Sequence, residues 1–291
     1  MIDWENLHYF SVFAQHKSLS AAARVLKVDH ATVARRISAL ESQLQLKLVD
    51  RRPRTYVLTT EGEKIALLAQ RMMEETFSIG RIAKAGQAVL RGEVSMSLPP
   101  ATAAHFIVPR LNRLRQQYPH IHLRVIVETR FASLQHSEAD IAVRLARPVE
   151  EGLVGRKIAQ LPFGMYATAE YLANRTPQQY EFISLDDTLI TSMQQRWLAE
   201  IQQERPVVLK TNSPDMQRLA AAAGVGVAIL PCFMGEQSGL QRIPCERINM
   251  MREVWLAVHQ DLRHSPLIRV VMDFLVQCFE DIPAFDDAST G

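Results

Sequence analysis

Arginine and small polar side chains alternate with apolar ones between Asp29 and Leu44. At about 100° per residue, the apolar residues of this segment fall on one side of a helix; they are Val33, Ile37, Leu40 and Leu44. Ala31, Arg35 and Ser38 fall on the opposite side. Guanidinium groups on an exposed helix face bind base edges and phosphates in a DNA groove. The pattern therefore predicts a helix that packs by one side and contacts DNA with the other.

Two shorter amphipathic segments precede this helix. Residues 4–16 place Leu7, Phe10 and Ala14 on one face, and a short alanine-rich helix up to residue 26 precedes a tight turn. Ser20 and Asp29 are expected to accept backbone N–H bonds at the first turns of the second and third helices. Three helices in this order predict a helix-turn-helix that docks on DNA.

A basic hairpin is expected after the third helix. Residues 51–59 pair an arginine-rich turn with a short β-prone run, as in a wing that lies over the DNA backbone or minor groove. Residues 24–56 hold eight Lys and Arg against three Asp and Glu, whereas the whole chain has a net charge of +2. Because the positive charge is local, it indicates contacts to the phosphates of double-stranded DNA.

A long amphipathic helix is expected from Thr60, its N-cap, to about residue 88. Its apolar residues recur every three or four positions, and the candidates for dimerisation are Ile65, Leu68, Met72 and Ile79. At 1.5 Å per residue this helix is on the order of 40 Å long, too long to be buried in its own small domain. We expect it to pair with a second copy and to present two helices to a pseudo-palindromic DNA site. The alternative is packing on the chain's own second domain.

From residue 93 onward, strands and helices alternate, which predicts an α/β fold with helices covering a sheet. The expected strands are residues 93–98, 122–128, 140–144, 163–168, 189–191, 207–211, 227–230 and 254–258. A helix over 102–118, bent near Pro109, and a last helix over 266–279 are also expected. Because the chain is long for one small sheet, we expect two lobes with a ligand-binding cleft between them.

The turn from Pro99 to Thr102 lies between an expected strand and the start of an expected helix. Free backbone N–H groups and the helix dipole favour an anion at such a place. Pro100 and Thr102 are therefore candidate binding residues for a small carboxylate or another polar metabolite.

The sequence gives little support for catalysis, metal binding or cofactor binding. No HExxH motif or P-loop is present, and Gly224-Val-Gly226 lacks the third glycine of a dinucleotide loop. We therefore expect no enzyme activity, no catalytic residue, no metal site and no cofactor; His120 and His122 are more simply a surface pair. The N-terminus has no signal-peptide pattern and no segment is long enough to span a bilayer, so a cytoplasmic protein without a membrane partner is expected.

Three cysteines, Cys232, Cys245 and Cys278, form no CxxC pair, and buried reduced thiols are the simplest interpretation. Regulation through an exposed, reactive cysteine is the alternative.

Several motifs resemble the LysR-type transcriptional regulator family across nearly the whole chain. They are Ser20-Ala-Ala-Ala, Thr32-Val-Ala-Arg-Arg-Ile-Ser-Ala-Leu-Glu41, Leu58-Thr-Thr-Glu-Gly62, Ala139-Asp-Ile-Ala-Val-Arg144 and Ala223-Gly-Val-Gly-Val-Ala-Ile-Leu-Pro231. The resemblance implies a winged helix-turn-helix over 1–59, a dimerising linker helix over 60–90 and an effector domain over 91–291. The effector domain is expected to resemble a periplasmic binding protein, with one lobe at 91–160 and 265–291 and the other at 161–264.

The resemblance also implies site residues. Arg35 is assigned to a base edge or phosphate, and His30, Thr32, Arg36, Arg52 and Arg54 to the DNA backbone or groove, with a solvated surface charge as the alternative for each arginine. The third helix begins Asp29-His-Ala31 where family members usually have Ser-Gln-Pro-Ala, so the operator sequence does not carry over.

In the effector domain the resemblance implies that Thr129, Arg144, Thr191 and Ser213 line the cleft with Pro100 and Thr102. Ser213 as a helix cap, and Arg144 as the partner of a neighbouring acid, are the alternatives. The implied function is ligand-responsive transcriptional regulation: effector binding shifts the lobes or the packing of dimers and so changes the DNA contacts. Tetramers formed through the effector domains and contact with RNA polymerase are further implied partners.

Overall fold

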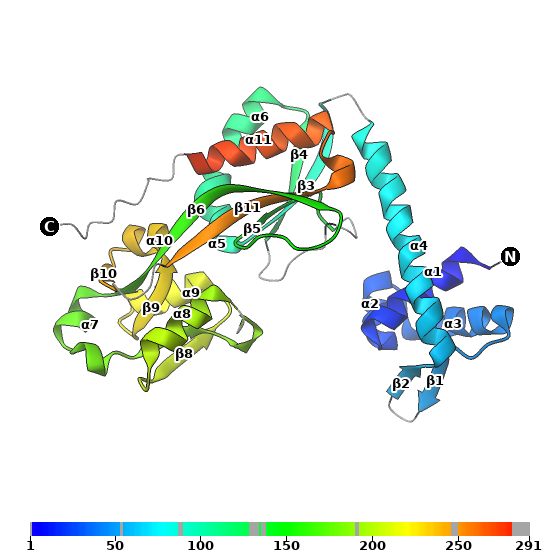
Figure 1. Ribbon diagram of the computed structural model, residues 1–291, viewed down its shortest axis with the longest axis horizontal. Helices are drawn as coiled ribbons and strands as arrows, with labels where there is room; N and C mark the ends of the chain where they lie inside the picture. Colours follow the sequence, from blue (N-terminus) through cyan, green and yellow to red (C-terminus); the bar gives the residue numbers. More distant parts are fainter. Residues whose placement is uncertain are drawn as a thin grey trace. The chain divides into compact units, whose positions relative to one another are not determined.

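The computed structural model describes residues 2–52, 55–86, 90–127, 134, 138–189, 192–245 and 250–280 (Figure 1). The chain divides into two compact units, Met1–Ala83 and Lys84–Gly291. Thr129, Thr191 and Arg54 lie outside the described residues, as does the side chain of Arg52.

The first unit is the expected winged helix-turn-helix. Its elements are α1 (Trp4–His16), α2 (Leu19–Leu26), α3 (His30–Leu44), β1 (Val49–Arg52), β2 (Thr55–Leu58) and α4 (Thr60–Ala85). Strands β1 and β2 form an antiparallel hairpin. The core contains Phe10 and Phe13 from α1 together with the apolar side of α3, namely Val33, Ile37 and Leu40. This packing leaves the other side of α3 free.

Two of the three expected helix caps are displaced by one or two residues. Asp29 caps α3 as expected, because its carboxylate accepts the Thr32 N–H at 2.7 Å. Helix α2 is instead capped by Ser18, whose hydroxyl accepts the Ala21 N–H at 3.3 Å, so Ser20 lies inside the first turn. Thr59 rather than Thr60 accepts the Gly62 N–H at 3.0 Å. In each case the cap is the last residue before helical geometry begins.

The second unit contains one mixed sheet. Its strands are β3 (Gly92–Leu98), β4 (Ile121–Val127), β5 (Ile141–Arg144), β6 (Leu153–Ala167), β7 (Phe182–Leu185), β8 (Val207–Thr211), β9 (Val227–Pro231), β10 (Gln241–Ile243) and β11 (Met251–His259). The order is β4-β3-β5-β11-β6-β9-β7-β8, and β10 also pairs with β6. Strand β3 is parallel to β4 and β5, so the carboxyl ends of these strands share one edge.

The long strand β6 joins two lobes. Its first part, up to Pro162, pairs with β11, and its last part, from Phe163, pairs with β9 and β10. We call β3, β4, β5, β11 and residues 153–162 the first lobe, and residues 163–167 with β7–β10 the second lobe. Strand β11 was expected in the second lobe, but it pairs with β5. The assignment was wrong because strand pairing is not encoded in local sequence.

Two other strand predictions also differ from the structure. The first part of β6 was missed, because its charged and exposed residues show no clear alternation. The expected strand at 189–191 is a 3₁₀ turn at Asp187–Leu189, and residues 190–191 lie outside the described ranges; the strand is β7, at Phe182–Leu185. Strand β7 is short and buried throughout, with no alternation of apolar and polar residues long enough to distinguish it from a buried helix segment.

The helices of the second unit pack on this sheet. The expected bent helix near Pro109 is a series of short pieces: α5 (Pro100–Thr102), a π-helical turn (Ala103–Ile107), a 3₁₀ turn (Val108–Arg110) and α6 (Leu111–Gln117). The others are α7 (Ala169–Ala173), α8 (Met193–Gln202), α9 (Pro214–Ala222), α10 (Cys232–Gln237) and α11 (Pro266–Glu280), with 3₁₀ turns at Pro177–Gln179 and Gln260–Leu262. Within the described chain, no helix combines the length and apolarity that a membrane span requires.

Candidate functional site

The outward side of α3 carries an unengaged arginine. Arg35 is exposed and has no hydrogen-bond or ion-pair partner in the described part of the chain, and His30 and Ala31 are exposed one turn earlier. Opposite them, Val33 and Ile37 are buried in the core. The predicted division of α3 into a packed and a free side is therefore confirmed, and Arg35 is available for an external partner.

Thr32 is held by the helix cap. Its backbone N–H and its hydroxyl both donate to the Asp29 carboxylate, at 2.7 and 2.9 Å. These hydrogen bonds hold the pKa of Asp29 below its usual value, because they favour the ionised form. The first turn of α3 is thus rigidly capped, while the predicted contact of Thr32 with DNA stays a prediction.

Arg36 is turned toward α1. Its Nη2 donates to Glu5 Oε1 at 2.7 Å, its Nη1 donates to Asn6 Oδ1 at 3.3 Å, and its guanidinium lies 5.6 Å from the centre of the Tyr9 ring. This charge is already balanced by Glu5. The geometry favours a structural link between α1 and α3, and the predicted DNA contact of Arg36 stays a prediction.

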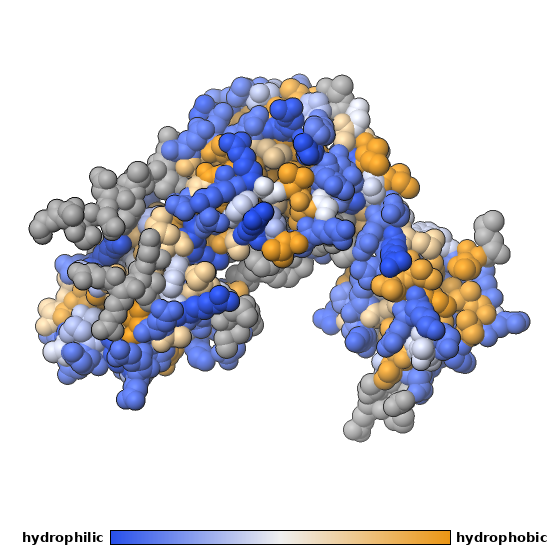
Figure 2. Space-filling view, in the orientation of Figure 1, coloured by the Kyte–Doolittle hydropathy of each residue, from blue (hydrophilic) through white to orange (hydrophobic). Residues whose placement is uncertain are grey.

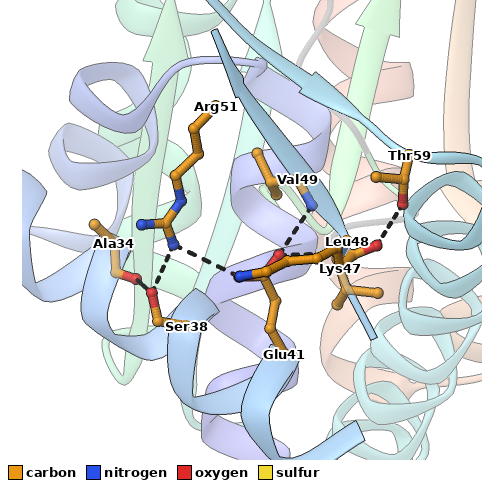
Figure 3. Close-up of polar contacts among 8 residues, drawn as sticks. All are labelled: Ala34, Ser38, Glu41, Lys47, Leu48, Val49, Arg51 and Thr59. Atoms are coloured by element: carbon orange, nitrogen blue, oxygen red, sulfur yellow. Dashed lines mark hydrogen bonds and ion pairs between the residues drawn. The ribbon is translucent and has the colours of Figure 1, made fainter. Parts of the chain in front are cut away.

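A polar cluster that was not predicted joins α3 to the hairpin (Figure 3). Glu41 is buried, with a side chain 3% exposed, and its Oε1 accepts the N–H groups of Leu48 and Val49 at 2.9 and 3.1 Å. Arg51 Nη2 donates to Ser38 Oγ at 2.6 Å and lies 3.6 Å from Glu41 Oε2. The one signal in the sequence was an acid next to the core residue Leu40, with basic residues following it.

Helix α4 leaves part of its apolar face uncovered. Leu68, Met72 and Ile79, three of the four dimerisation candidates, are between 48% and 69% exposed. Ile65, the fourth, is partly buried against the core of the first unit. Figure 2 shows hydrophobic side chains on the surface of the region where α1 and α4 lie. An apolar stripe that the single chain does not cover is suited to a protein partner.

The effector candidates of the first lobe lie at the carboxyl edge of its strands. Pro100 begins α5 one residue after the end of β3, and Thr102 is buried at the end of that single turn. Arg144 ends β5 and is also buried; its Nη1 donates to the carbonyl oxygen and the hydroxyl of Ser97, both at 3.1 Å. Burial lowers the pKa of Arg144. These contacts join Arg144 to the neighbouring strand.

In the second lobe, Ser213 is the N-cap of α9, and its hydroxyl accepts the Met216 N–H at 3.4 Å. This is the capping role that was given as the alternative. Thr129 and Thr191 lie outside the described residues, and the shared cleft of the six effector candidates stays a prediction.

Arg252, which the sequence interpretation missed, lies where the lobes meet. Its Nη2 donates to the carbonyl oxygen of Leu145, just after β5, and its guanidinium lies 6.0 Å from the ring centre of Phe163, where β6 enters the second lobe. Its Nε is buried without a hydrogen-bond partner, and no described carboxylate lies within ion-pair distance of it. Burial lowers the pKa of Arg252 to about 10. This charge is therefore uncompensated within the described chain.

The cysteines form no reactive cluster among the described residues. Cys232 and Cys278 are buried, Cys245 is half-buried, and all three are free thiols. Burial raises the pKa of the Cys232 thiol, which disfavours the reactive thiolate. The described ranges also contain no group of three or more His, Cys, Asp or Glu side chains placed to hold a metal ion.

A winged helix-turn-helix with a free arginine on its outward helix, followed in the same chain by a two-lobed α/β unit, defines a DNA-binding regulator with a ligand-binding domain. The family description "Bacterial regulatory helix-turn-helix protein, lysR family" matches residues 4–63, and "LysR substrate binding domain" matches residues 87–279. The chain belongs to the LysR family of transcriptional regulators.

Individual proteins similar to this chain are also transcriptional regulators. HTH-type transcriptional regulator CrgA of Neisseria meningitidis serogroup C is 26% identical over 287 residues, covering 94% of this chain and 96% of CrgA. The glycine cleavage system transcriptional activator of Escherichia coli K12 is 33% identical over 152 residues, covering 52% of this chain and 49% of that activator. The full-length Vibrio cholerae virulence activator AphB has a TM-score of 0.62 at 19% identity, covering 94% of this chain and 99% of AphB, a likeness that shows the fold.

Proposed function

We propose that this protein binds a specific pseudo-palindromic site on double-stranded DNA as a homodimer, and that a small anionic effector bound by its second unit changes that binding. The observation that carries the DNA assignment is the free side of α3, where Arg35 is exposed and has no partner among the described residues while the opposite side is buried. Arg35 is assigned to a base edge or a phosphate, and His30 and the wing arginines Arg52 and Arg54 to the backbone or groove.

The uncovered face of α4 supports the homodimer. Leu68, Met72 and Ile79 recur at helical spacing and remain exposed in the single chain. Pairing α4 with a second copy buries this stripe and gives each DNA half-site one α3. Tetramer formation through the second unit and contact with RNA polymerase are further proposals that family membership supports.

The uncompensated charge of Arg252 supports an anionic effector. A half-buried guanidinium without a described counter-ion is costly, and a bound carboxylate at the junction of the lobes offsets that cost. Strand β6 runs from the first lobe into the second, and Arg252 lies beside that transition, so a ligand at this place contacts both lobes. Effector binding then shifts the balance between lobe arrangements.

The DNA assignment is tested with Arg35→Ala. Selection of DNA from a random pool defines the operator of the wild type, and fluorescence anisotropy then gives affinity for the operator and for scrambled DNA. Removing a bidentate base contact is expected to cost about 1–3 kcal/mol of discrimination, a factor of roughly 5 to 150. Arg263→Ala, which removes an exposed arginine from the second unit, is the matched control. Unchanged operator preference in Arg35→Ala would contradict the assignment.

A further inference from the structure

One side chain of the hairpin, that of Arg51, extends the outward surface of α3. Ser38 lies three residues beyond Arg35, so the two side chains are neighbours on the same side of the helix. Arg51 of β1 donates from Nη2 to Ser38 Oγ at 2.6 Å, and Ser38 Oγ donates to the Ala34 carbonyl oxygen at 2.9 Å. The guanidinium of Arg51 is therefore held on the outward side of α3 although its backbone belongs to the hairpin (Figure 3).

At the junction between α3 and the hairpin, the negative charge is buried and the positive charges are exposed. The Glu41 carboxylate is buried, whereas the two cations next to it reach solvent: the side chains of Lys47 and Arg51 are 80% and 47% exposed. Their nitrogens lie 3.5 and 3.6 Å from Glu41 Oε2. Two exposed positive charges around one buried negative charge leave a net positive surface, which suits a phosphate.

Burying a carboxylate costs free energy, and the contacts of Glu41 compensate for this cost. Its Oε1 accepts the N–H groups of Leu48 and Val49, which fixes the start of β1 against the last turns of α3. Its Oε2 has no hydrogen bond and faces the two cations. Glu41 therefore sets both the position of the hairpin backbone and the direction of the Arg51 side chain.

We propose that Arg51 binds a backbone phosphate of the DNA, and that Ser38 and Glu41 are positioning residues that hold Arg51 ready for this contact. The proposal rests on the proposed DNA-binding function. Fixing a long side chain before binding lowers the entropy lost on association, so this contact gains affinity by pre-organisation. Because a phosphate carries no sequence information, the contribution is the same for operator and scrambled DNA.

The phosphate contact is tested with Arg51→Gln, using the operator selected with the wild type. Affinity is measured by fluorescence anisotropy at several salt concentrations. Loss of one phosphate contact is expected to reduce the slope of log K against log salt by about 0.9 per subunit. Operator and scrambled DNA are expected to weaken by the same factor, in contrast to Arg35→Ala. Arg263→Ala is again the control, and the melting temperature verifies the fold.

The positioning roles are tested by a double-mutant cycle. Glu41→Gln keeps an acceptor for the two N–H groups. With Arg51 present, Ser38→Ala and Glu41→Gln are each expected to lower the affinity for DNA several-fold. In the Arg51→Gln background both are expected to have little further effect, because the side chain they position is absent. A merely structural role would lower affinity equally in both backgrounds.

The outcomes separate the two levels of the proposal. Wild-type DNA binding with an unchanged salt slope in Arg51→Gln overturns the phosphate assignment and leaves the proposed function intact. Additive effects of Ser38→Ala and Arg51→Gln overturn the positioning role. Absence of specific binding by the wild type overturns the proposed function and, with it, this inference.

Discussion

Neighbouring arginines on one helix have different environments. Arg35 and Arg36 are adjacent in sequence, but about 100° of helical rotation separates them, and only Arg36 reaches Glu5 and Asn6 on α1. Arg51, far along the chain, is instead brought to the side of Arg35 by Ser38. The composition of a basic segment therefore does not reveal which of its charges are free to bind phosphate.

Arg252 provides a prediction about stability. In Arg252→Met a half-buried charge with no counter-ion among the described residues is replaced by an apolar side chain, so the ligand-free protein is expected to be more stable by about 1–2 kcal/mol. Urea unfolding followed by circular dichroism measures this change. The melting-temperature increase caused by benzoate or succinate in the wild type is expected to disappear in the variant.

Arg263→Met is the matched control, because it makes the same replacement at an exposed position. A lower free energy of unfolding for Arg252→Met would show that Arg252 stabilises the fold and would remove the argument for an anionic effector. The neutral amides benzamide and succinamide are expected to leave the wild type unshifted.

At the scale of elements, α4 combines two environments along its length. Near its start Ile65 packs on the core of the first unit, while Leu68, Met72 and Ile79 are exposed. Near its end, Lys84 Nζ forms an ion pair with Asp140 Oδ2 at 2.6 Å. One helix thus contributes to the first unit, to the second unit and to the proposed dimer.

Charged substitutions on the uncovered stripe are expected to prevent dimerisation. Leu68→Asp combined with Ile79→Asp introduces charges into the proposed interface, where burying them without partners is strongly unfavourable. Sedimentation velocity is expected to show a monomer, and operator affinity is expected to fall because each monomer binds only one half-site. Val149→Asp, which alters an even more exposed apolar residue of the second unit, is expected to remain dimeric. A dimeric double variant would locate the interface elsewhere.

At the scale of the whole molecule, the second unit begins within the last turn of α4. Asp140 Oδ2 accepts the N–H and the hydroxyl of Ser95, each at 2.7 Å, as well as the ion pair from Lys84. The Asp140 carboxylate therefore joins β3, the start of β5 and the end of the linker helix. The first lobe is therefore attached to the last turn of α4 through this ion pair.

Asp140→Ala is expected to destabilise the second unit by about 2–4 kcal/mol, because it leaves the buried N–H and hydroxyl of Ser95 and the Lys84 ammonium unpaired. Urea unfolding monitored by circular dichroism measures this loss. Asp187→Ala, which removes the partner of Lys210 from an exposed ion pair, is the control and is expected to change little. Equal effects of the two substitutions would show that the Asp140 cluster is not structural.

Much of the first unit follows from local sequence. The free and buried sides of α3, the Asp29 cap and the apolar stripe of α4 depend on residues three or four positions apart, and helix geometry is the same in any context. The motifs that resemble LysR-type regulators likewise indicate the family and its architecture. For these features the sequence alone was sufficient.

Only the tertiary structure decided which charges are engaged and which strands pair. Glu5 with Arg36, Glu41 with Arg51, Lys84 with Asp140 and Arg252 with the Leu145 carbonyl join residues that are distant along the chain. The pairing of β11 with β5 is of the same kind. These contacts depend on how the chain packs against itself, and local periodicity carries no information about that packing.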